Sequence, residues 1–281
     1  MPELPEVETI RRELEKEIVG KRVRSVTISD GARVVRRHRP ASQFVAKLEK
    51  RKVLGVERRG KYLLVWLDSS LVLVVHLGMS GQLLWVKSAK EPTEKHTHVV
   101  VSFGPGVGEL RFVDPRTFGE LFVTAGEQLE EAIPELAHLG FDPLDQVMSW
   151  IRFRELLVGH KTKLKPLLMD QRFIAGIGNI YSDEILFAAG LRWDRTPDSL
   201  TPQEVRRLYR AMVETLGDAI RHRGSSLADE QYRDLFGEVG GFQSQHNVYD
   251  REGEPCRRCR TPIVRLKVAG RSSFMCPRCQ V

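Results

Sequence analysis

Cysteine spacing constrains the fold of this 281-residue chain more tightly than any other feature of its sequence. All of its cysteines fall in the stretch CRRCRTPIVRLKVAGRSSFMCPRC, where they follow the pattern C-x2-C-x16-C-x2-C. Two such pairs at this separation are typical of a tetrahedral zinc site in which every ligand is a thiolate. Such a site is structural, because no ligand position remains for a substrate. The ligands would be Cys256, Cys259, Cys276 and Cys279.

Disulfide bonds are the weaker interpretation of these cysteines, because the chain starts with acidic residues and lacks the apolar region of a secretory signal. We therefore predict a zinc ribbon over residues 246–281, with a hairpin that turns at Ala269–Gly270 between the cysteine pairs. No apolar run approaches the roughly 20 residues that cross a membrane. A cytoplasmic location is expected.

Positive charge is concentrated in the same C-terminal segment. The whole chain carries a formal net charge of +7, and residues 246–281 hold eight Arg or Lys against three Asp or Glu. Four thiolates around one zinc ion would lower this local excess of +5 to about +3. Arg271 would lie at the hairpin tip, flanked by Arg265 and Lys267. A polyanionic partner is indicated, and an idle solvated surface is the alternative.

The N-terminal half of the chain predicts a helix followed by a β-sandwich. Val7, Ile10, Leu14 and Ile18 form one apolar stripe of a helix that Gly20 ends. From residue 22 to residue 125, short runs rich in Val, Leu and aromatic residues alternate with Gly, Pro, Asp and Ser. Five or more such runs without intervening helices indicate a sandwich or a barrel. We assign residues 1–142 to this domain.

Helical patterns replace the strands after residue 142. In TPQEVRRLYRAMVETLGDAIRHRG, Thr201 can cap the helix, Pro202 suits its first position and Glu204 completes a capping box. The polar, glycine-containing stretch 225–245 is interpreted as a mobile loop. The predicted fold class is therefore α+β, with a helical domain at 143–245 between the sandwich and the zinc ribbon.

A glycine-rich turn precedes another predicted helix, in the stretch GIGNIYSDEILF. Gly176 and Gly178 leave the backbone open to close approach, Asn179 stands at the helix start, and Ser182 and Asp183 are candidate caps. Exposed backbone N–H groups at a helix start bind phosphate readily. An ordinary turn is the alternative, since the third glycine and the leading strand of a dinucleotide motif are missing.

The N-terminus could itself carry chemistry. If the initiator methionine is removed, the chain begins with the secondary amine of Pro2. An α-amino group titrates near about 7.7–8.0, so a large part of it is neutral and nucleophilic at working pH. Glu3 is the adjacent acid–base candidate, and Glu6 lies one helical turn further on. The alternative is that these acids only stabilise the helix dipole.

Six motifs occur in one order, and together they resemble the formamidopyrimidine-DNA glycosylases, which excise oxidised purines and nick the DNA strand. The opening PELPEVET favours this family over the endonuclease VIII group, whose start usually reads PEGPE. The resemblance covers nearly the whole chain. The motifs are MPELPEVETIRREL at the start, GKYLL at 60–64, HLGMSG at 76–81, DPRTFG at 114–119, GIGNIYSDEILF at 176–187 and the terminal cysteine pairs.

The resemblance implies a catalytic role for five residues. Pro2 would attack the sugar C1′ and form a Schiff base, Glu3 would protonate the opened sugar or the leaving base, and Glu6 would support it. Lys61 matches the lysine assigned to β-elimination and phosphate contact. Arg271 matches the zinc-hairpin arginine that grips phosphates and is assigned to δ-elimination.

The resemblance also implies contacts with duplex DNA that contains damaged bases or abasic sites. The damaged nucleotide must leave the base stack, and Met79, Arg116 and Phe118 match the residues that fill the gap. Arg116 would also hydrogen-bond the estranged base, which is expected to be cytosine. Asn179 matches the phosphate-binding asparagine of the helix–two-turns–helix element, and His96 and Lys161 match further contacts. The expected active form is a monomer.

Two departures from the family pattern affect the expectations. Asp250 stands where glycine is common, which is a tolerated change before the zinc module. The loop that corresponds to the lesion-reading loop is unusually acidic, with Asp229, Glu230, Asp234 and Glu238. The expected substrates are oxidised purines, namely formamidopyrimidines and 8-oxoguanine, and the alternative is the excision of oxidised pyrimidines that is typical of the sister group. A catalytically silent DNA-binding zinc protein is a further alternative, although Pro2, Glu3 and Lys61 argue against it.

Overall fold

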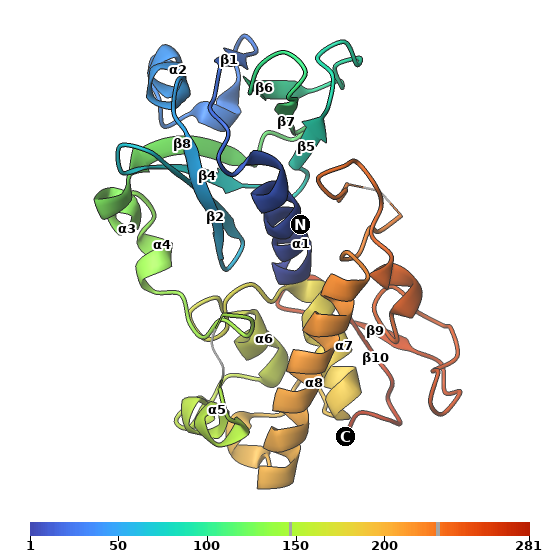
Figure 1. The fold of residues 1–281 in the computed structure, drawn as a ribbon. Coiled ribbons are helices and arrows are strands. Elements are labelled where there is room, and N and C mark those ends of the chain that lie inside the picture. Colours follow the sequence, from blue (N-terminus) through green and yellow to red (C-terminus); the bar gives the residue numbers. More distant parts are fainter. Residues whose placement is uncertain (146–147, 229–230) are drawn as a thin grey trace. The chain divides into compact units, whose positions relative to one another are not determined.

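The computed structural model describes residues 1–145, 148–228 and 231–281. The chain forms two compact units (Figure 1). The first contains Met1–His138 and His222–Gly241, and the second contains Leu139–Arg221 and Phe242–Val281. The loop that follows the longest helix thus groups with the N-terminal sandwich, whereas the sequence places it with the helical segment. The division into three separately folding domains stays a prediction.

Two four-stranded antiparallel sheets build the first unit. One sheet has the order β1 (Ser25–Ile28), β6 (Thr97–Ser102), β7 (Glu109–Val113) and β5 (Gln82–Val86). The other has the order β2 (Val53–Arg59), β3 (Tyr62–Leu67), β4 (Leu71–His76) and β8 (Glu120–Ala125). Side chains of both sheets, such as Val65 and Leu73 from one and Trp85 and Phe112 from the other, share one buried core. The predicted β-sandwich is confirmed.

Helix α1 (Leu4–Ile18) packs on β2 and β3. Its start follows from the sequence, because Pro5 suits the first turn and Glu3 and Glu6 form a reciprocal capping box. The apolar stripe predicted for this helix is buried in the sandwich core. Shorter elements complete the unit, namely η1 (Arg33–Val35), α2 (Ser42–Leu48), η2 (Gly126–Gln128), α3 (Leu129–Ala132) and α4 (Pro134–Ala137).

Helices dominate the second unit. They are α5 (Trp150–Leu157), α6 (Leu164–Met169), α7 (Asn179–Ala189), η3 (Pro197–Ser199), α8 (Pro202–Arg221) and η4 (Phe242–Gln245). Helix α7 is buried along most of its length and packs against α6, α8 and strand β10 (Arg271–Met275). Thr201 and Glu204 form the predicted capping box of α8, with the Thr201 N–H donating to Glu204 Oε2 over 2.8 Å.

The C-terminal hairpin pairs β9 (Val264–Val268) with β10, and Arg271 lies opposite Val268. This register confirms the predicted turn at Ala269–Gly270. Both turn residues have positive φ, which the two-residue hairpin turn requires. The α+β fold class is confirmed by these elements. Among the described helices, none is both long and apolar enough to cross a membrane.

Candidate active site and nucleic-acid interface

The first turn of α1 is buried and held from two sides. Pro2, Glu3 and Glu6 are all buried. The Glu6 carboxylate accepts the Glu3 N–H at Oε2 and the Ser225 N–H at Oε1, each over 2.8 Å. Gly224 makes this approach possible, because a Cβ there would lie 2.7 Å from Glu6 Oε1 and its φ of +78° disfavours other residues. Glu6 therefore joins the N-terminal turn to the loop after α8.

Arg58 connects the same helix to the turn that carries Lys61. Its buried guanidinium donates from Nε to Glu8 Oε2 over 3.2 Å and from Nη1 to the Gly60 carbonyl over 3.0 Å. Lys61 follows Gly60 in the two-residue turn between β2 and β3 and is buried. The Glu8–Arg58–Gly60 chain thus fixes the lysine turn against the helix whose start holds Pro2.

Charge at this end of the sandwich shifts two ionisable groups. Burial alone would raise the pKa of Glu8, but hydrogen bonds from Arg11 and Arg12 and the charge of Arg58 lower it below its usual value. Burial lowers the pKa of His76, and the positive charge of Lys61 lowers it further. Glu8 is therefore anionic and His76 neutral at neutral pH, next to a cationic lysine.

Two neighbouring turns present the residues expected to fill a gap in DNA. In the HLGMSG turn, Gly78 approaches the other turn so closely that a Cβ would lie 2.6 Å from the backbone nitrogen of Gly119. Ser80 Oγ donates to Asp114 Oδ1 over 2.6 Å, which ties the HLGMSG turn to the DPRTFG turn. The fully buried Asp114 also accepts the N–H groups of Arg116 and Gly119.

The side chains on these paired turns point away from the core. Met79 is 41% exposed and Phe118 is 52% exposed, whereas large apolar side chains are normally buried. The Arg116 guanidinium lies over the Phe118 ring, 4.9 Å from its centroid. His96 is exposed beside them, and its carbonyl accepts the Asp114 N–H over 3.1 Å. The four residues predicted from the sequence as DNA contacts of the sandwich are brought together around Asp114.

In the second unit, α7 and β10 hold the predicted phosphate contacts together. Asn179 is the first residue of α7, and its Nδ2 donates to the Ser272 carbonyl over 3.0 Å. The exposed Arg271 directly precedes Ser272. Lys161 is also exposed, in the loop between α5 and α6. Asn179 and Arg271 are thus brought together by a contact within this unit, and Lys161 lies apart in the chain.

The prediction that Ser182 and Asp183 cap α7 is wrong. The helix begins after Gly178, and both residues lie inside it. Asp183 instead accepts the Ser273 hydroxyl and the Phe274 N–H from β10 and the buried Lys165 ammonium from α6, over 2.7 to 2.9 Å. Burial raises the pKa of Asp183 to about 6, although Lys165 and these donors oppose the rise. Asp183 therefore attaches the hairpin to the helix.

Glu184, the next residue of α7, attaches the segment that leads into the cysteine module to this helix. Its carboxylate accepts backbone N–H groups of Asn247, Val248 and Tyr249 over about 2.9 to 3.0 Å. A carboxylate that accepts several backbone N–H groups orders the segment that supplies them. Helix α7 therefore fixes both sides of the module through consecutive acidic residues.

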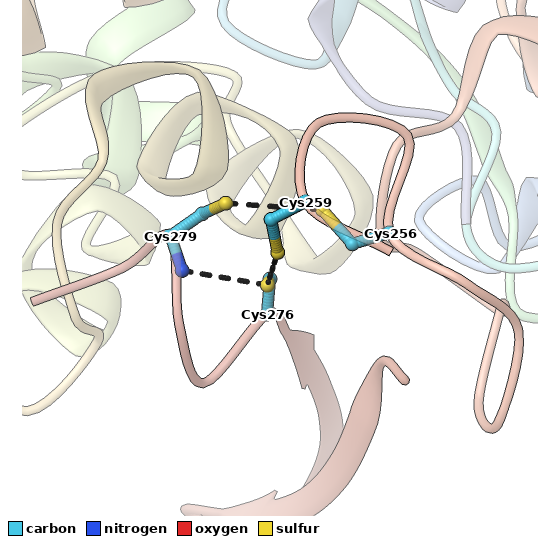
Figure 2. Close-up of side chains that lie close together, drawn as sticks. All are labelled: Cys256, Cys259, Cys276 and Cys279. Carbon is cyan, nitrogen blue, oxygen red and sulfur yellow. Dashed lines mark hydrogen bonds between the residues drawn. The ribbon is translucent and has the colours of Figure 1, made fainter. Parts of the chain in front are cut away.

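The cysteine sulfurs converge as the sequence predicts (Figure 2). All four lie within 4.8 Å of one another, with Cys259 and Cys276 separated by 3.5 Å and Cys256 and Cys279 by 3.9 Å. A tetrahedral ion with Zn–S bonds of about 2.3 Å requires sulfurs about 3.8 Å apart. The N–H groups of Arg258 and Cys279 point to sulfurs at 3.4 Å, which favours thiolates. The donor set fits a thiolate-bound metal ion.

The acidic loop is partly buried where the structure describes it, and its predicted mobility stays a prediction. Asp229 and Glu230 lie outside the described residues. Asp234 is fully buried and pairs with Arg223, whereas Glu238 is exposed. Asp250 has φ +59°, a conformation that glycine adopts more readily.

Family models match three successive parts of this chain. Residues 1–121 match the family model described as the formamidopyrimidine-DNA glycosylase N-terminal domain, residues 139–231 match its H2TH domain, and residues 253–281 match the zinc finger found in FPG and IleRS. A formamidopyrimidine-DNA glycosylase of Geobacillus kaustophilus is 46% identical over the full length of both chains. The chain belongs to the formamidopyrimidine-DNA glycosylase family.

Solved structures of family members agree with this assignment. The crystal structure of MutM (Fpg) from Thermus thermophilus has a TM-score of 0.84 at 44% identity, covering 99% of this chain and 98% of that one. Lactococcus lactis Fpg, in a complex with DNA containing an abasic site, has a TM-score of 0.88 at 35% identity, covering 99% of each chain. The resemblance drawn from the six motifs is confirmed.

Sequence reasoning missed the residues that hold these sites in place. Asp114 lies in the DPRTFG motif, from which the sequence predicts roles for Arg116 and Phe118 only, and Arg58 stands two residues before the GKYLL motif. Lys165 and Glu184 also lie in or beside recognised stretches. A local signal is present only for Glu184, whose charge stands directly before the apolar run ILFAA, because a buried charged residue needs a partner.

Proposed function

We propose that the protein is a bifunctional DNA glycosylase and abasic-site lyase that removes oxidised purines, including formamidopyrimidines and 8-oxoguanine, from duplex DNA. The observation that carries the proposal is the buried first turn of α1, where Glu6 holds both the Glu3 backbone and the loop at Ser225. Family membership and this arrangement together support a catalytic N-terminus. Stabilising the helix start does not by itself explain why the Glu6 carboxylate also accepts a hydrogen bond from Ser225, which is more than 200 residues away in the chain.

In the proposed reaction, the amine of Pro2, freed by removal of Met1, attacks the sugar C1′. The C1′–N bond to the damaged base breaks as the N–C1′ bond forms, and Glu3 donates a proton to the opened sugar or the leaving base. The amine gives up its proton, the C1′–O4′ bond breaks with a proton going to O4′, and the product is an iminium between the Pro2 nitrogen and C1′. Glu6 keeps Glu3 in place through its hydrogen bond to the Glu3 backbone.

Strand cleavage follows by two eliminations. The iminium acidifies the C2′ proton, and its removal expels the 3′ phosphate; Lys61 is assigned to this β-elimination. Arg271 grips the phosphates and is assigned to the δ-elimination that expels the 5′ phosphate. The support from this chain is that Lys61 is held by the Glu8–Arg58–Gly60 contacts next to α1.

Duplex DNA with a damaged base or abasic site is the proposed partner. Met79, Arg116 and Phe118 would enter the space left by the extruded nucleotide, because an adaptable thioether and an aromatic wedge suit an opened base step. His96, Lys161 and Asn179 would contact phosphates. A point mutant of Lactococcus lactis Fpg is seen in a complex with DNA containing Fapy-dG, and the wild-type protein in one with DNA containing an oxidised pyrimidine. The preference for purines therefore has to be tested directly against a pyrimidine lesion.

One structural zinc ion is proposed for the cysteine module, where Cys256, Cys259, Cys276 and Cys279 would hold it. The ion supplies fold stability and no reacting position, because every ligand is a thiolate. The hairpin that it supports carries Arg271. The proposed active form is a monomer in the cytoplasm, at the nucleoid.

Trapping with sodium borohydride tests the amine mechanism. The protein is incubated with duplex containing 8-oxoguanine, an oxidised pyrimidine or no lesion, and reduction should yield a covalent adduct with the first substrate in largest amount. A variant with two residues added before Pro2 should trap nothing, because the amine becomes an amide. Lys16→Ala, which removes an exposed amine of the same helix, should trap like the parent.

Absence of an adduct with zinc-loaded protein that binds the damaged duplex would refute the mechanism and favour the silent DNA-binding alternative. A larger yield with the oxidised pyrimidine would favour the activity of the sister group instead.

A further inference from the structure

The loop between residues 222 and 241 is attached to the same face of α1 that bears the catalytic turn. Glu6 and Glu13 are two turns apart on that helix, and both accept backbone N–H groups of the loop. Glu6 Oε1 accepts Ser225 at 2.8 Å, and Glu13 Oε2 accepts Leu235 at 3.0 Å. The Leu235 carbonyl in turn accepts the Trp85 N–H of β5 over 2.7 Å.

An ion cluster of Glu13, Arg223 and Asp234 stabilises this attachment. The Arg223 guanidinium contacts both carboxylates, and its Nε lies 2.9 Å from Asp234 Oδ2. Asp234 is 0% exposed and the Glu13 side chain is 9% exposed. Burial raises the pKa of Glu13, and the neighbouring Asp234 charge adds to the rise. Arg223 therefore neutralises two buried acids that would otherwise repel each other.

Asp234 also shapes the loop that it anchors. Its Oδ1 accepts the N–H groups of Phe236 and Glu238, over 2.9 and 3.0 Å, and closes a tight turn. Gly237 takes the positive φ of +81° that this turn needs. The turn leaves Phe236 and Val239 each 44% exposed. Exposed apolar side chains on a turn with a buried ionic base provide a fixed contact surface.

The other end of the loop is closed by Ser226. Its hydroxyl donates to the Tyr232 carbonyl over 2.7 Å and accepts the Gly240 N–H over 2.9 Å. Tyr232 OH donates to the Arg223 carbonyl over 3.0 Å, and this hydrogen bond connects the Ser226 contacts to the ion cluster. Residues near both ends of the loop are thus hydrogen-bonded to α1, at Ser225 and at Leu235, so the position of α1 determines where the loop lies.

We propose that Glu13, Arg223 and Asp234 are positioning residues for base recognition, holding the loop at a set distance from the catalytic turn of α1. This inference rests on the proposed glycosylase function. The cluster acts on excision of a damaged base, because this loop corresponds in the sequence to the family's lesion-reading loop. An abasic site has no base to contact, and its nicking uses the amine, Glu3, Lys61 and Arg271, none of which belongs to the cluster.

The test compares two substrates under single-turnover conditions: duplex with one 8-oxoguanine, and the same duplex with a preformed abasic site. Glu13→Gln and Asp234→Asn keep the hydrogen-bond acceptors for Leu235 and Phe236 but remove a charge. Each should slow base excision by about tenfold, while nicking of the abasic site stays within about twofold of the parent. Glu15→Gln, at an exposed position of the same helix, should change neither rate.

Hydrogen exchange supplies a readout apart from activity. The Leu235 amide donates to Glu13, and the neutral oxygen of Glu13→Gln accepts more weakly than the carboxylate, so exchange of this amide should speed up while the amides of β3 and β4 keep their protection. Arg223→Lys retains the positive charge and should recover part of the excision rate lost in Arg223→Met.

Equal slowing on both substrates would overturn the inference and make the cluster a purely structural element. Parent-like rates in all variants would overturn it as well. If the parent protein processed neither substrate, the proposed function itself would fail, and the inference with it.

Discussion

Each unit of the protein contains a buried acid–base pair beside a functional turn, and the two pairs differ in their electrostatics. In the sandwich, Glu8 pairs with Arg58 and lies beside Arg11 and Arg12, which reach solvent. In the helical unit, Asp183 pairs with Lys165, and both side chains are at most 2% exposed. The pKa of Glu8 is lowered, whereas the pKa of Asp183 is raised to about 6.

The difference shows what decides the state of a buried carboxylate. Several guanidinium groups at the edge of the structure outweigh the burial of Glu8, so its charge is stabilised. A single ammonium group in an enclosed site does not outweigh the burial of Asp183. Attachment of the lysine turn to α1 therefore rests on a favourable ion pair, and attachment of the Arg271 hairpin to α7 rests on a desolvated one.

The hairpin needs a further support, and metal removal should show the largest effect of all. The described apolar cluster of the cysteine module is small, comprising Phe187, Val248, Ile263 and Phe274 with buried cysteines. Cys256→Ser, or chelation, should unfold the module and weaken DNA binding by more than about a hundredfold, because structural zinc contributes about 10–16 kcal/mol to small domains. Fluorescence anisotropy with labelled abasic duplex measures the loss.

Sandwich integrity is the control for this prediction. The N-terminal core contains no metal-ligating cluster among the described residues, so hydrogen exchange of β3 and β4 should stay at parent levels in Cys256→Ser. Affinity that survived metal loss would show that the module does not anchor DNA.

The desolvated pair should give the next largest effect. Asp183→Asn removes the carboxylate that faces the buried Lys165 and should lower the free energy of unfolding by about 3–5 kcal/mol. The double variant Asp183→Asn with Lys165→Met should recover part of this loss, because no charge remains buried. Urea unfolding measures both. A double variant less stable than Asp183→Asn would contradict the view that desolvation dominates this pair.

Glu8→Gln tests the favourable pair of the sandwich. The glutamine cannot replace a charged acceptor for Arg58, and we expect a loss of roughly 1.5–3 kcal/mol in the free energy of unfolding. β-Elimination at an abasic site should slow more than DNA binding weakens, because the Lys61 turn loses its connection to α1. Glu15→Gln, which removes only an exposed ion pair, should lie within about 0.5 kcal/mol of the parent.

Sequence reasoning predicted the motif-bearing turns and the metal ligands but not the contacts that hold them. The strands, the capped helices and the cysteine hairpin follow from local patterns, because periodicity and turn chemistry act over a few residues. The Ser80–Asp114 and Arg58–Glu8 contacts join segments 34 and 50 residues apart. Such pairings depend on sheet register and tertiary packing, which local patterns do not encode. Asp183 is a further example, because the residues next to it in the sequence suggest a helix cap, whereas its actual partners lie on α6 and β10.

The two pairs should also differ in the sign of their pH dependence. Asp183 has a raised pKa of about 6 against an ordinary value of 3.8, so the folded protein binds more protons between these values and gains stability as pH falls through this window. Glu8 has a lowered pKa, so its contribution is present above 4.5 and is lost as pH falls below it. Lowering the pH from about 7 to about 4 should therefore widen the difference in unfolding free energy between the parent and Asp183→Asn. Further acidification should narrow the difference between the parent and Glu8→Gln. Urea unfolding at each pH measures both differences. If both differences in unfolding free energy changed in the same direction, burial and charge would be balanced in the same way at the two carboxylates. That result would contradict the view that guanidinium groups outweigh burial at Glu8 but that one ammonium group does not at Asp183.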